Sequence, residues 1–330
     1  MIDRNRREFL KAAAAGLIMS PLAASVLATQ EESSGGLPQR ALGKTGQKVS
    51  ILCLGGWHIG SIPEQEAIRL MHQAIDEGIN FFDNAWDYHQ GGSEEVMGKA
   101  LSDGGRRDKV FLMTKVCDRD YAGAKKQLED SLRRLRTDHL DLWQFHEINY
   151  PKDPQWVFEK GGIKAAMEAR KEGKVRFIGF TGHKDIQFHQ EMLNKPFEWD
   201  TVQMPINIMD AHFRSFQKEI VPECNRRQIG VIGMKGLAGG HIPKELGLSA
   251  EVCRRYALSL PITTLVCGIT SRKELEQDLG VARGFKPIGP AELEKLLADT
   301  KEEGSQGKHE PFKTSRRFDG GYHRRQHGVT

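Results

Sequence analysis

Short apolar runs alternate with amphipathic segments along most of the chain. In the first amphipathic segment, Ile68, Met71 and Ile75 recur at three- and four-residue spacing before Gly78, which predicts a helix with a glycine cap. The same periodicity returns in later segments, and the apolar runs between these helices predict buried strands. The eight predicted strands are 49–54, 79–83, 110–115, 140–145, 175–180, 201–204, 229–234 and 264–268.

Eight strand–helix units in succession favour an α/β fold, the closed parallel (β/α)8 TIM barrel. Parallel strands need crossover helices, and helices on the outside bury the strands on both faces. In such a barrel the carboxyl ends of all strands lie at one end, so residues that follow different strands become neighbours. We therefore expect catalytic side chains directly after strands.

Four residues capable of proton transfer follow the second, third and fourth predicted strands. Asp83 ends the second strand, Tyr88 follows five residues later, Lys115 ends the third, and His146 follows the fourth. Each has an ordinary alternative: Asp83 as a helix N-cap, Lys115 as a solvated strand end, His146 as a core residue. Because they occur together at equivalent strand ends, we expect them to form one site.

Several segments, in one order, resemble the aldo-keto reductase family. The likeness is carried by Phe82–Ala85 with Trp86, Asp87 and Tyr88, and it continues over most of the chain. The segment 40–46 resembles the hairpin that closes the barrel floor in that family. The other similar segments are 92–95, 98–101, 131–135, 138–142, 173–179 and 268–279. The resemblance implies reversible hydride transfer between a nicotinamide cofactor and a small carbonyl or alcohol.

The resemblance also implies a role for each of the four residues. Tyr88 is the general acid that gives a proton to the carbonyl oxygen, where negative charge builds up. A free phenol has a pKa of about 10, so Tyr88 needs electrostatic help from the Lys115 ammonium. Asp83 holds Lys115 charged and oriented, and His146 donates to or orients the substrate oxygen. This scheme requires no metal.

The cofactor positions implied by the resemblance lie at strand ends and at the start of the last barrel helix. That helix start offers backbone N–H groups to a phosphate, and Arg272 favours NADP(H) over NAD(H), although Glu274 stands where some members have an arginine. Gln277 and Asp278 replace the usual adenine-facing pair, and Met234 replaces an aromatic residue. The predicted cofactor residues are Gly56, Trp57, Thr181, Gly182, Gln203, Met234, Lys235, Gly268, Thr270, Ser271, Arg272, Gln277 and Asp278.

The predicted substrate contacts are aromatic and histidine residues near the same strand ends. Trp57, His58 and Trp86 suit the entrance of a pocket for a hydrophobic or ring-bearing carbonyl, and His183 follows the fifth strand. The barrel is expected to span 40–312. For the basic C-terminal tail, residues 313–330, a solvated or disordered tail is favoured over an anion-binding flap.

The amino terminus resembles a twin-arginine export signal. Arg6 and Arg7 precede an apolar stretch from Ala12 to Leu27, which is short for a membrane span of about 20 residues. We expect a signal peptide at 1–28, a flexible lead at 29–39, and export to the periplasm by the twin-arginine translocation machinery, with no stable membrane span after cleavage. The alternative is a chance basic and apolar start that folds as a helix. Because free cofactor is scarce in a periplasm, we hypothesise slow cofactor release.

Composition agrees with one enzyme domain and argues against several other functions. A net charge of +4 and the absence of a basic helix give no case for nucleic-acid binding. The five cysteines contain no C-x-x-C spacing, so neither an iron–sulfur cluster nor structural zinc is expected. A metal-dependent barrel hydrolase would need a His-x-His pair after the first strand, where only His58 stands. A cofactor-binding or sensing protein on the reductase scaffold, with little turnover, remains the alternative function.

Overall fold

The predicted strands form one closed barrel in which parallel strands pair in chain order. The barrel closes where the last strand pairs with the first. This arrangement confirms the predicted (β/α)8 barrel and brings the carboxyl ends of the strands to one end, the barrel mouth. The strands are β4 (Leu52–Gly55), β5 (Phe81–Asp83), β6 (Phe111–Val116), β7 (Leu140–Phe145), β8 (Val175–Thr181), β9 (Thr201–Pro205), β10 (Gly230–Met234) and β11 (Thr264–Cys267).

This computed structural model describes residues 31–32 and 36–329. The predicted signal peptide, 1–28, lies outside the described residues. Glu31–Glu32 forms β1 and pairs with β2 (Pro38–Ala41), so these parts of the expected flexible lead belong to a small sheet. In the described ranges, helices long and apolar enough to cross a membrane are absent.

A hairpin closes the end of the barrel opposite the mouth. The predicted strand 49–54 is divided, because β3 (Lys48–Ser50) pairs antiparallel with β2 while β4 begins at Leu52. Arg40 ties the hairpin to the barrel by donating to the carbonyl oxygens of Leu258 (2.8 Å) and Ile262 (2.7 Å). Leu42 and Val49 pack with the barrel-interior side chains, so the hairpin fills the barrel floor.

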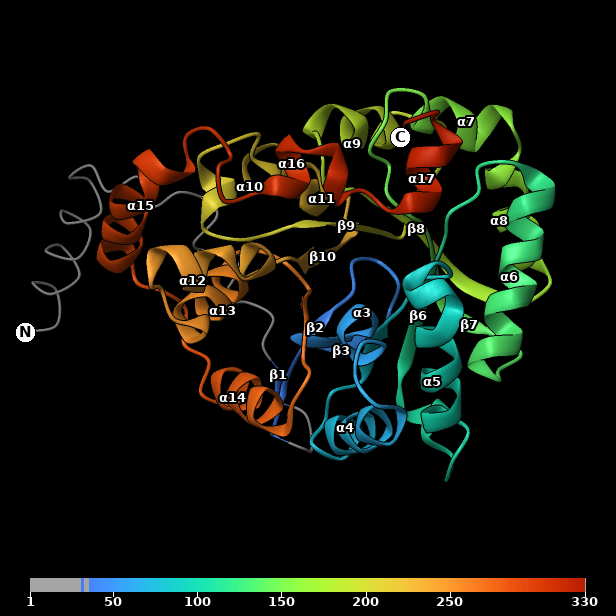
Figure 1. Ribbon diagram of the computed structural model, residues 1–330, viewed down its shortest axis with the longest axis horizontal. Helices are drawn as coiled ribbons and strands as arrows, with labels where there is room; N and C mark the ends of the chain where they lie inside the picture. The colour runs from blue at the N-terminus through green and yellow to red at the C-terminus, as the bar shows by residue number, and fades with distance from the viewer. Residues whose placement is uncertain (1–30, 33–35, 330) are drawn as a thin grey trace, which may run out of the picture.

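Amphipathic helices surround the barrel, as Figure 1 shows. The first of them, α4, ends at Asp76 and is followed by Gly78 at φ 98°, in agreement with the predicted glycine cap. The helices on the outside of the barrel are α4 (Glu64–Asp76), α5 (Gly92–Leu101), α6 (Tyr121–Leu135), α8 (Gly162–Lys171), α9 (Ile186–Leu193), α11 (Val221–Arg226), α13 (Ala250–Ser259) and α14 (Arg272–Arg283). The additional helices are α3 (Gly56–Ile59), α7 (Asp153–Glu159), α10 (Phe216–Glu219), α12 (His241–Leu246), α15 (Pro290–Gly304), α16 (Pro311–Thr314) and α17 (Gly321–Gln326).

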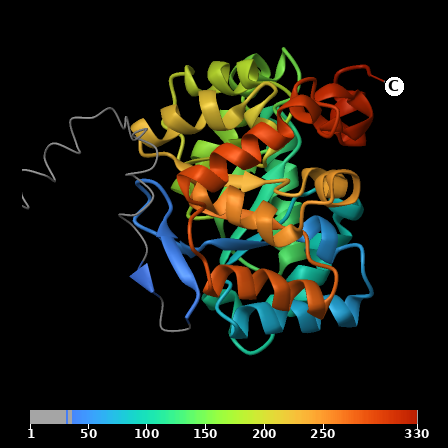
Figure 2. The same ribbon diagram turned by 90° about the vertical axis from the view of Figure 1, so that its left-hand side faces the viewer.

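The last part of the chain, residues 311–329, is here called the C-terminal segment. It contains α16, the 3-10 turn η5 (Arg316–Phe318) and α17, and Figure 2 shows it at the opposite end of the molecule from the hairpin. The expectation of a solvated or disordered tail is wrong for the described residues. Lys313 is buried and pairs with the nearby Glu310 (2.8 Å) and with the distant Asp210 (2.6 Å), and the second pair holds the segment against the rest of the fold.

Candidate active site

Asp83, Lys115 and Tyr88 lie together at the barrel mouth. Lys115 Nζ donates to a carboxylate oxygen of Asp83 and to the carbonyl oxygen of Asn84 (2.7 Å), and it lies 3.4 Å from the Tyr88 hydroxyl. Asp83 and Lys115 are 3% and 1% exposed, so this ion pair is shielded from water. The expected convergence is therefore present, while the catalytic roles of the residues stay predictions.

Backbone pairing beyond the strands positions Tyr88. The N–H groups of Asn84 and Trp86 donate to the carbonyl oxygens of Met113 (2.9 Å) and Lys115 (3.1 Å), which extends the β5–β6 contact past the end of β5. The chain then turns into the 3-10 turn η1 (Tyr88–Gly91). This turn brings the phenol back to Lys115 instead of directing it to solvent.

His146 lies beside the phenol, with the two rings edge to face at 5.5 Å. Its backbone N–H donates to the carbonyl oxygen of Val116 (2.8 Å), which fixes it to the end of β6. Its Nδ1 lies 3.1 Å from Asp87 Oδ1 and 3.7 Å from Cys117 Sγ. Sequence reasoning missed Asp87 and Cys117, although both lie within five residues of predicted site residues.

The surroundings favour a protonated phenol and a neutral imidazole. Burial, followed by the negative charges of Asp83 and Asp87, raises the pKa of Tyr88 well above its ordinary value. The help that the Lys115 ammonium is expected to give to the phenolate stays a prediction. Burial also lowers the pKa of His146, although Asp87 opposes the shift. Tyr88 is thus held in the form that can donate a proton.

The C-terminal segment covers this group of residues. His323, on α17, packs edge to face against His146 at 5.3 Å. The Tyr322 hydroxyl donates to Asp118 (2.7 Å), and Gly320 N–H donates to Glu147 (2.9 Å). Sequence analysis missed these contacts, because the tail has no local pattern that identifies its partners.

The predicted substrate residues lie in different environments. Trp57 is 52% exposed and packs its edge against Tyr88 at 5.3 Å, so it stands at the entrance. His58 follows it and lies close to Gly268, whose added Cβ would come within 2.4 Å of the His58 ring. Trp86 instead contacts α6 and Tyr322, and His183 is buried. Only Trp57 and His58 therefore line an exposed part of the mouth in this arrangement.

His183 is joined to the C-terminal segment. Its Nε2 lies 3.1 Å from Asp319 Oδ1 and 3.1 Å from Asn149 Nδ2. Asp319 also pairs with Lys184 (2.7 Å) and accepts from the Tyr150 hydroxyl (2.8 Å). The predicted substrate residue His183 is thus occupied by the segment that covers the site.

At the ends of β8, β9 and β10, the residues fit a nicotinamide group. Gln203 donates to Asp83 Oδ2 (3.2 Å), while its buried Oε1 has no partner among the described residues and is therefore available as an acceptor. Thr181 lies nearby in the fold and accepts from Glu147 N–H (3.2 Å), and Gly182 leaves no room for a Cβ, which would lie 2.6 Å from Ile148 O. An acceptor such as Gln203 Oε1 suits the N–H groups of a carboxamide.

The neighbouring residues after β10 contact the C-terminal segment. Met234 ends β10, and the Lys235 ammonium lies over the ring of Phe318 at 5.1 Å. Burial lowers the pKa of Lys235 to about 8. The predicted nicotinamide side of the site is therefore partly covered by the segment.

The start of α14, where a cofactor phosphate is predicted to bind, is less suited to an anion. Ser271 caps α14, but Glu274 accepts from both the backbone N–H (2.7 Å) and the hydroxyl (2.8 Å) of Thr270. Arg272 is paired with Glu276 (2.7 Å) at the surface. A carboxylate at this helix start repels an incoming phosphate, so an open site here requires Glu274 to move.

The two residues predicted to face the adenine, Gln277 and Asp278, do not face the site. Gln277 is exposed, whereas both carboxylate oxygens of the buried Asp278 accept from Arg254, at 3.0 and 3.2 Å. Asp278 therefore fixes α14 to α13 in this structure and faces the protein interior. Gly56, the first residue of α3, lies against Asp83, because an added Cβ would come within 2.5 Å of Asp83 O.

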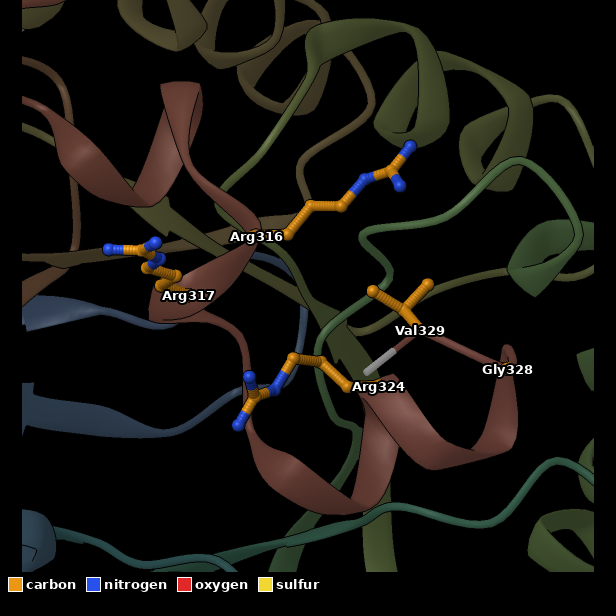
Figure 3. A pocket seen from close by; sticks show the side chains of 5 residues that line it. All are labelled: Arg316, Arg317, Arg324, Gly328 and Val329. Carbon is orange, nitrogen blue, oxygen red and sulfur yellow. The ribbon is translucent and has the colours of Figure 1, made fainter.

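A cavity of about 270 Å³ lies within the C-terminal segment. Figure 3 shows that its three arginine side chains point in different directions. Because the guanidinium groups do not converge, the cavity does not form a single anion site in this arrangement. Its lining residues are Arg316, Arg317, Arg324, Gly328 and Val329.

Comparisons with known proteins give one consistent family. Residues 51–249 match the Aldo/keto reductase family. The uncharacterized oxidoreductase YrpG of Bacillus subtilis is 34% identical over 226 residues, which are 60% of this chain and 66% of that protein. Methylglyoxal reductase YeaE of Escherichia coli is 32% identical over 191 residues, 56% of this chain and 63% of that protein. The chain thus spans slightly less than two thirds of the length of these relatives.

Solved structures agree with this result. The holo form of aldo-keto reductase AKR11C1 from Bacillus halodurans has a TM-score of 0.70 and 26% identity, over 80% of this chain and 96% of that one. An aldo/keto reductase from Klebsiella pneumoniae in complex with NADP and acetate has a TM-score of 0.66 and 22% identity, over 80% and 94% of the chains, and so supports the fold alone. With more than half of its sequence matched, this chain belongs to the aldo/keto reductase family.

Proposed function

We propose that this protein is an NAD(P)(H)-dependent oxidoreductase that interconverts a carbonyl and an alcohol by hydride transfer. The observation that carries the proposal is the contact between Lys115 and Tyr88 at 3.4 Å, with Asp83 and His146 beside them at the barrel mouth. Family membership supports the reaction class, and the preference for NADP(H) over NAD(H) stays a prediction from Arg272. The metal-free scheme stays a prediction.

The nicotinamide supplies or accepts the hydride when it is bound. Tyr88 gives its proton to the substrate oxygen during reduction, and the reverse transfer accompanies oxidation. The Lys115 ammonium stabilises the negative charge that remains on the phenol, and Asp83 holds that ammonium in place. His146 orients the substrate oxygen beside the phenol, while Gln203 and Thr181 would bind the carboxamide.

We also propose that the protein works outside the cytoplasm. The support is the paired Arg6 and Arg7 before an apolar stretch, which resembles a twin-arginine signal. That route carries folded proteins, so the enzyme would travel with its cofactor bound. Slow cofactor release follows from this proposal, because a periplasm offers little replacement.

The variant Tyr88→Phe tests the proposed chemistry. It removes the proton donor and leaves the ring, so we expect turnover of a carbonyl panel to fall by about 100-fold to 10,000-fold. NADPH affinity, measured by fluorescence titration, should stay within about twofold, because the hydroxyl is not a predicted cofactor contact. Tyr121→Phe is the matched control, since that hydroxyl binds Glu168 (2.6 Å) on the outside of the barrel. Full carbonyl reduction by Tyr88→Phe would defeat the assignment.

A second function is favoured by the covered mouth. The C-terminal segment packs on His146 and Glu274 occupies the phosphate end, which suits a cofactor-binding or sensing protein with little turnover. The same titration separates the two functions. NADPH or NADH binding without turnover of any carbonyl in the panel would support the sensor, and turnover that depends on Tyr88 would exclude it.

A further inference from the structure

Four potential metal ligands meet beneath α17, and only His146 has a role in the proposed reaction. Their ligand atoms, a carboxylate oxygen, a thiol sulfur and two imidazole nitrogens, all lie within 4.8 Å of one another. They come from four separate parts of the chain: the loop after β5, the ends of β6 and β7, and the C-terminal segment. The residues are Asp87, Cys117, His146 and His323.

We propose that these four residues bind one transition-metal ion of the Zn²⁺ class, which fastens the C-terminal segment over the barrel mouth. Zinc bonds of about 2.0–2.3 Å place tetrahedral ligand atoms roughly 3.3–3.8 Å apart. The separations of His146 Nδ1 from Asp87 Oδ1, 3.1 Å, and from Cys117 Sγ, 3.7 Å, are close to that range. Any pair near the upper bound of 4.8 Å needs to shorten by about 1 Å for a closed site.

His323 supplies an independent observation. It is fully buried, and neither of its ring nitrogens has a hydrogen-bond partner among the described residues. A buried imidazole without a partner is unfavourable, and a metal ion would use its free lone pair. His189 also lacks partners, but it packs against the rings of Phe180 and Phe216 and belongs to no group of ligands.

The chemistry of the ligands selects the ion. A thiolate and two imidazoles suit Zn²⁺, Co²⁺ and similar ions, whereas Mg²⁺ and Ca²⁺ prefer oxygen ligands. Hydrogen bonds from a residue next to the cluster also hold the ligands in place. Arg119 donates to the carbonyl oxygens of Cys117 (3.0 Å) and His146 (2.7 Å), which fixes the two strand ends relative to each other.

Metal binding has a consequence that rests on the proposed function. The ion would bind Nδ1 of His146 and join it to α17, so the metal-bound form would be closed over the mouth and for that reason inactive. Removal of the ion would free both His146 and the segment. The metal site itself does not depend on the reaction, and it can be tested without an activity assay.

The test is a titration of the full chain with Co²⁺, on protein without a histidine tag and stripped with a chelator. We expect one ion per chain, a thiolate-to-cobalt charge-transfer band, and displacement of Co²⁺ by Zn²⁺. Cys117→Ser should remove the band, and His323→Ala should weaken binding at least tenfold. Cys224→Ser and His241→Ala are the matched controls, because both residues lie outside the cluster.

Two results would contradict the proposed metal site. One is the absence of stoichiometric Co²⁺ binding by the wild-type chain. The other is that Cys117→Ser keeps the charge-transfer band of the controls and His323→Ala binds Co²⁺ as tightly as the controls do. Because these measurements need no substrate, failure of the metal site and failure of the proposed reductase are distinguishable.

Discussion

Asp319 is a buried ionic anchor of the C-terminal segment, and its replacement by asparagine should loosen the segment. The carboxylate is 4% exposed. It pairs with Lys184 (2.7 Å), contacts His183 (3.1 Å) and accepts from the Tyr150 hydroxyl (2.8 Å). Asparagine keeps the shape of the side chain but removes the charge, so Lys184 loses its compensating partner.

The size of the effect follows from this burial. Removing one partner of a buried ion pair costs about 3–5 kcal/mol, and we take the lower end, because Lys184 keeps a hydrogen bond to Ser315 O (2.7 Å). At about 1.4 kcal/mol per tenfold change, a loss of about 3 kcal/mol raises the open population of the segment roughly 100-fold.

Trypsin cleavage measures that population. Arg316, Arg317, Arg324 and Arg325 provide cleavage sites within the segment, and cleavage follows the open fraction when closing is fast. We expect release of the C-terminal peptide, followed by mass spectrometry, to accelerate roughly 100-fold in Asp319→Asn. Asp299→Asn is the matched control, because Asp299 forms an exposed pair with Lys295 (3.4 Å) worth at most about 1 kcal/mol. Equal cleavage rates in the two variants would refute the anchoring role.

Two further predictions concern stability. Burial lowers the pKa of His183 to about 3. The unfolded chain therefore binds more protons than the folded chain below the ordinary histidine value, and stability is lost as the pH falls. Between about pH 6.5 and pH 5 this histidine alone should cost roughly 2 kcal/mol, and urea unfolding that gave equal stability at both pH values would contradict the burial argument. Gly98→Ala places a Cβ 2.1 Å from Arg134 O, where α5 meets α6, and should destabilise the fold by about 1–3 kcal/mol. Gly280→Ala, in α14, meets no atom within 4 Å and should instead stabilise the fold by up to about 1 kcal/mol in the same unfolding assay. If both substitutions changed the unfolding free energy in the same direction, the steric explanation would be contradicted.

The barrel was predictable because its signals are local. Apolar runs and helical periodicity identify the strands one at a time, and the closed parallel arrangement then places Asp83, Lys115 and His146 at one end. The division of the first predicted strand was not predictable, because residues 49–54 are apolar except for Ser50 and contain no turn residue between β3 and β4. β3 and β4 are separate strands only because β3 pairs with β2.

The parts that were missed depend on contacts between distant residues. Lys313 is buried because it meets Asp210, and Asp278 turns inward because it meets Arg254. In each case the sequence shows a charged residue, which on average is exposed, and no local pattern identifies the partner. The raised pKa of Tyr88 was also missed, because its largest cause is burial, which follows from the tertiary fold and not from the local sequence.

Closure of the C-terminal segment and cofactor binding should compete. The segment contacts His183 through Asp319, Lys235 through Phe318, and His146 through His323, so it covers predicted substrate, cofactor and catalytic positions. If binding requires the open form, the apparent dissociation constant equals the intrinsic one divided by the open fraction. Asp319→Asn should then tighten NADPH binding by the same factor by which it accelerates trypsin cleavage, until the open form predominates. An NADPH affinity that stays constant while cleavage accelerates would show that the segment covers the mouth without controlling access to it.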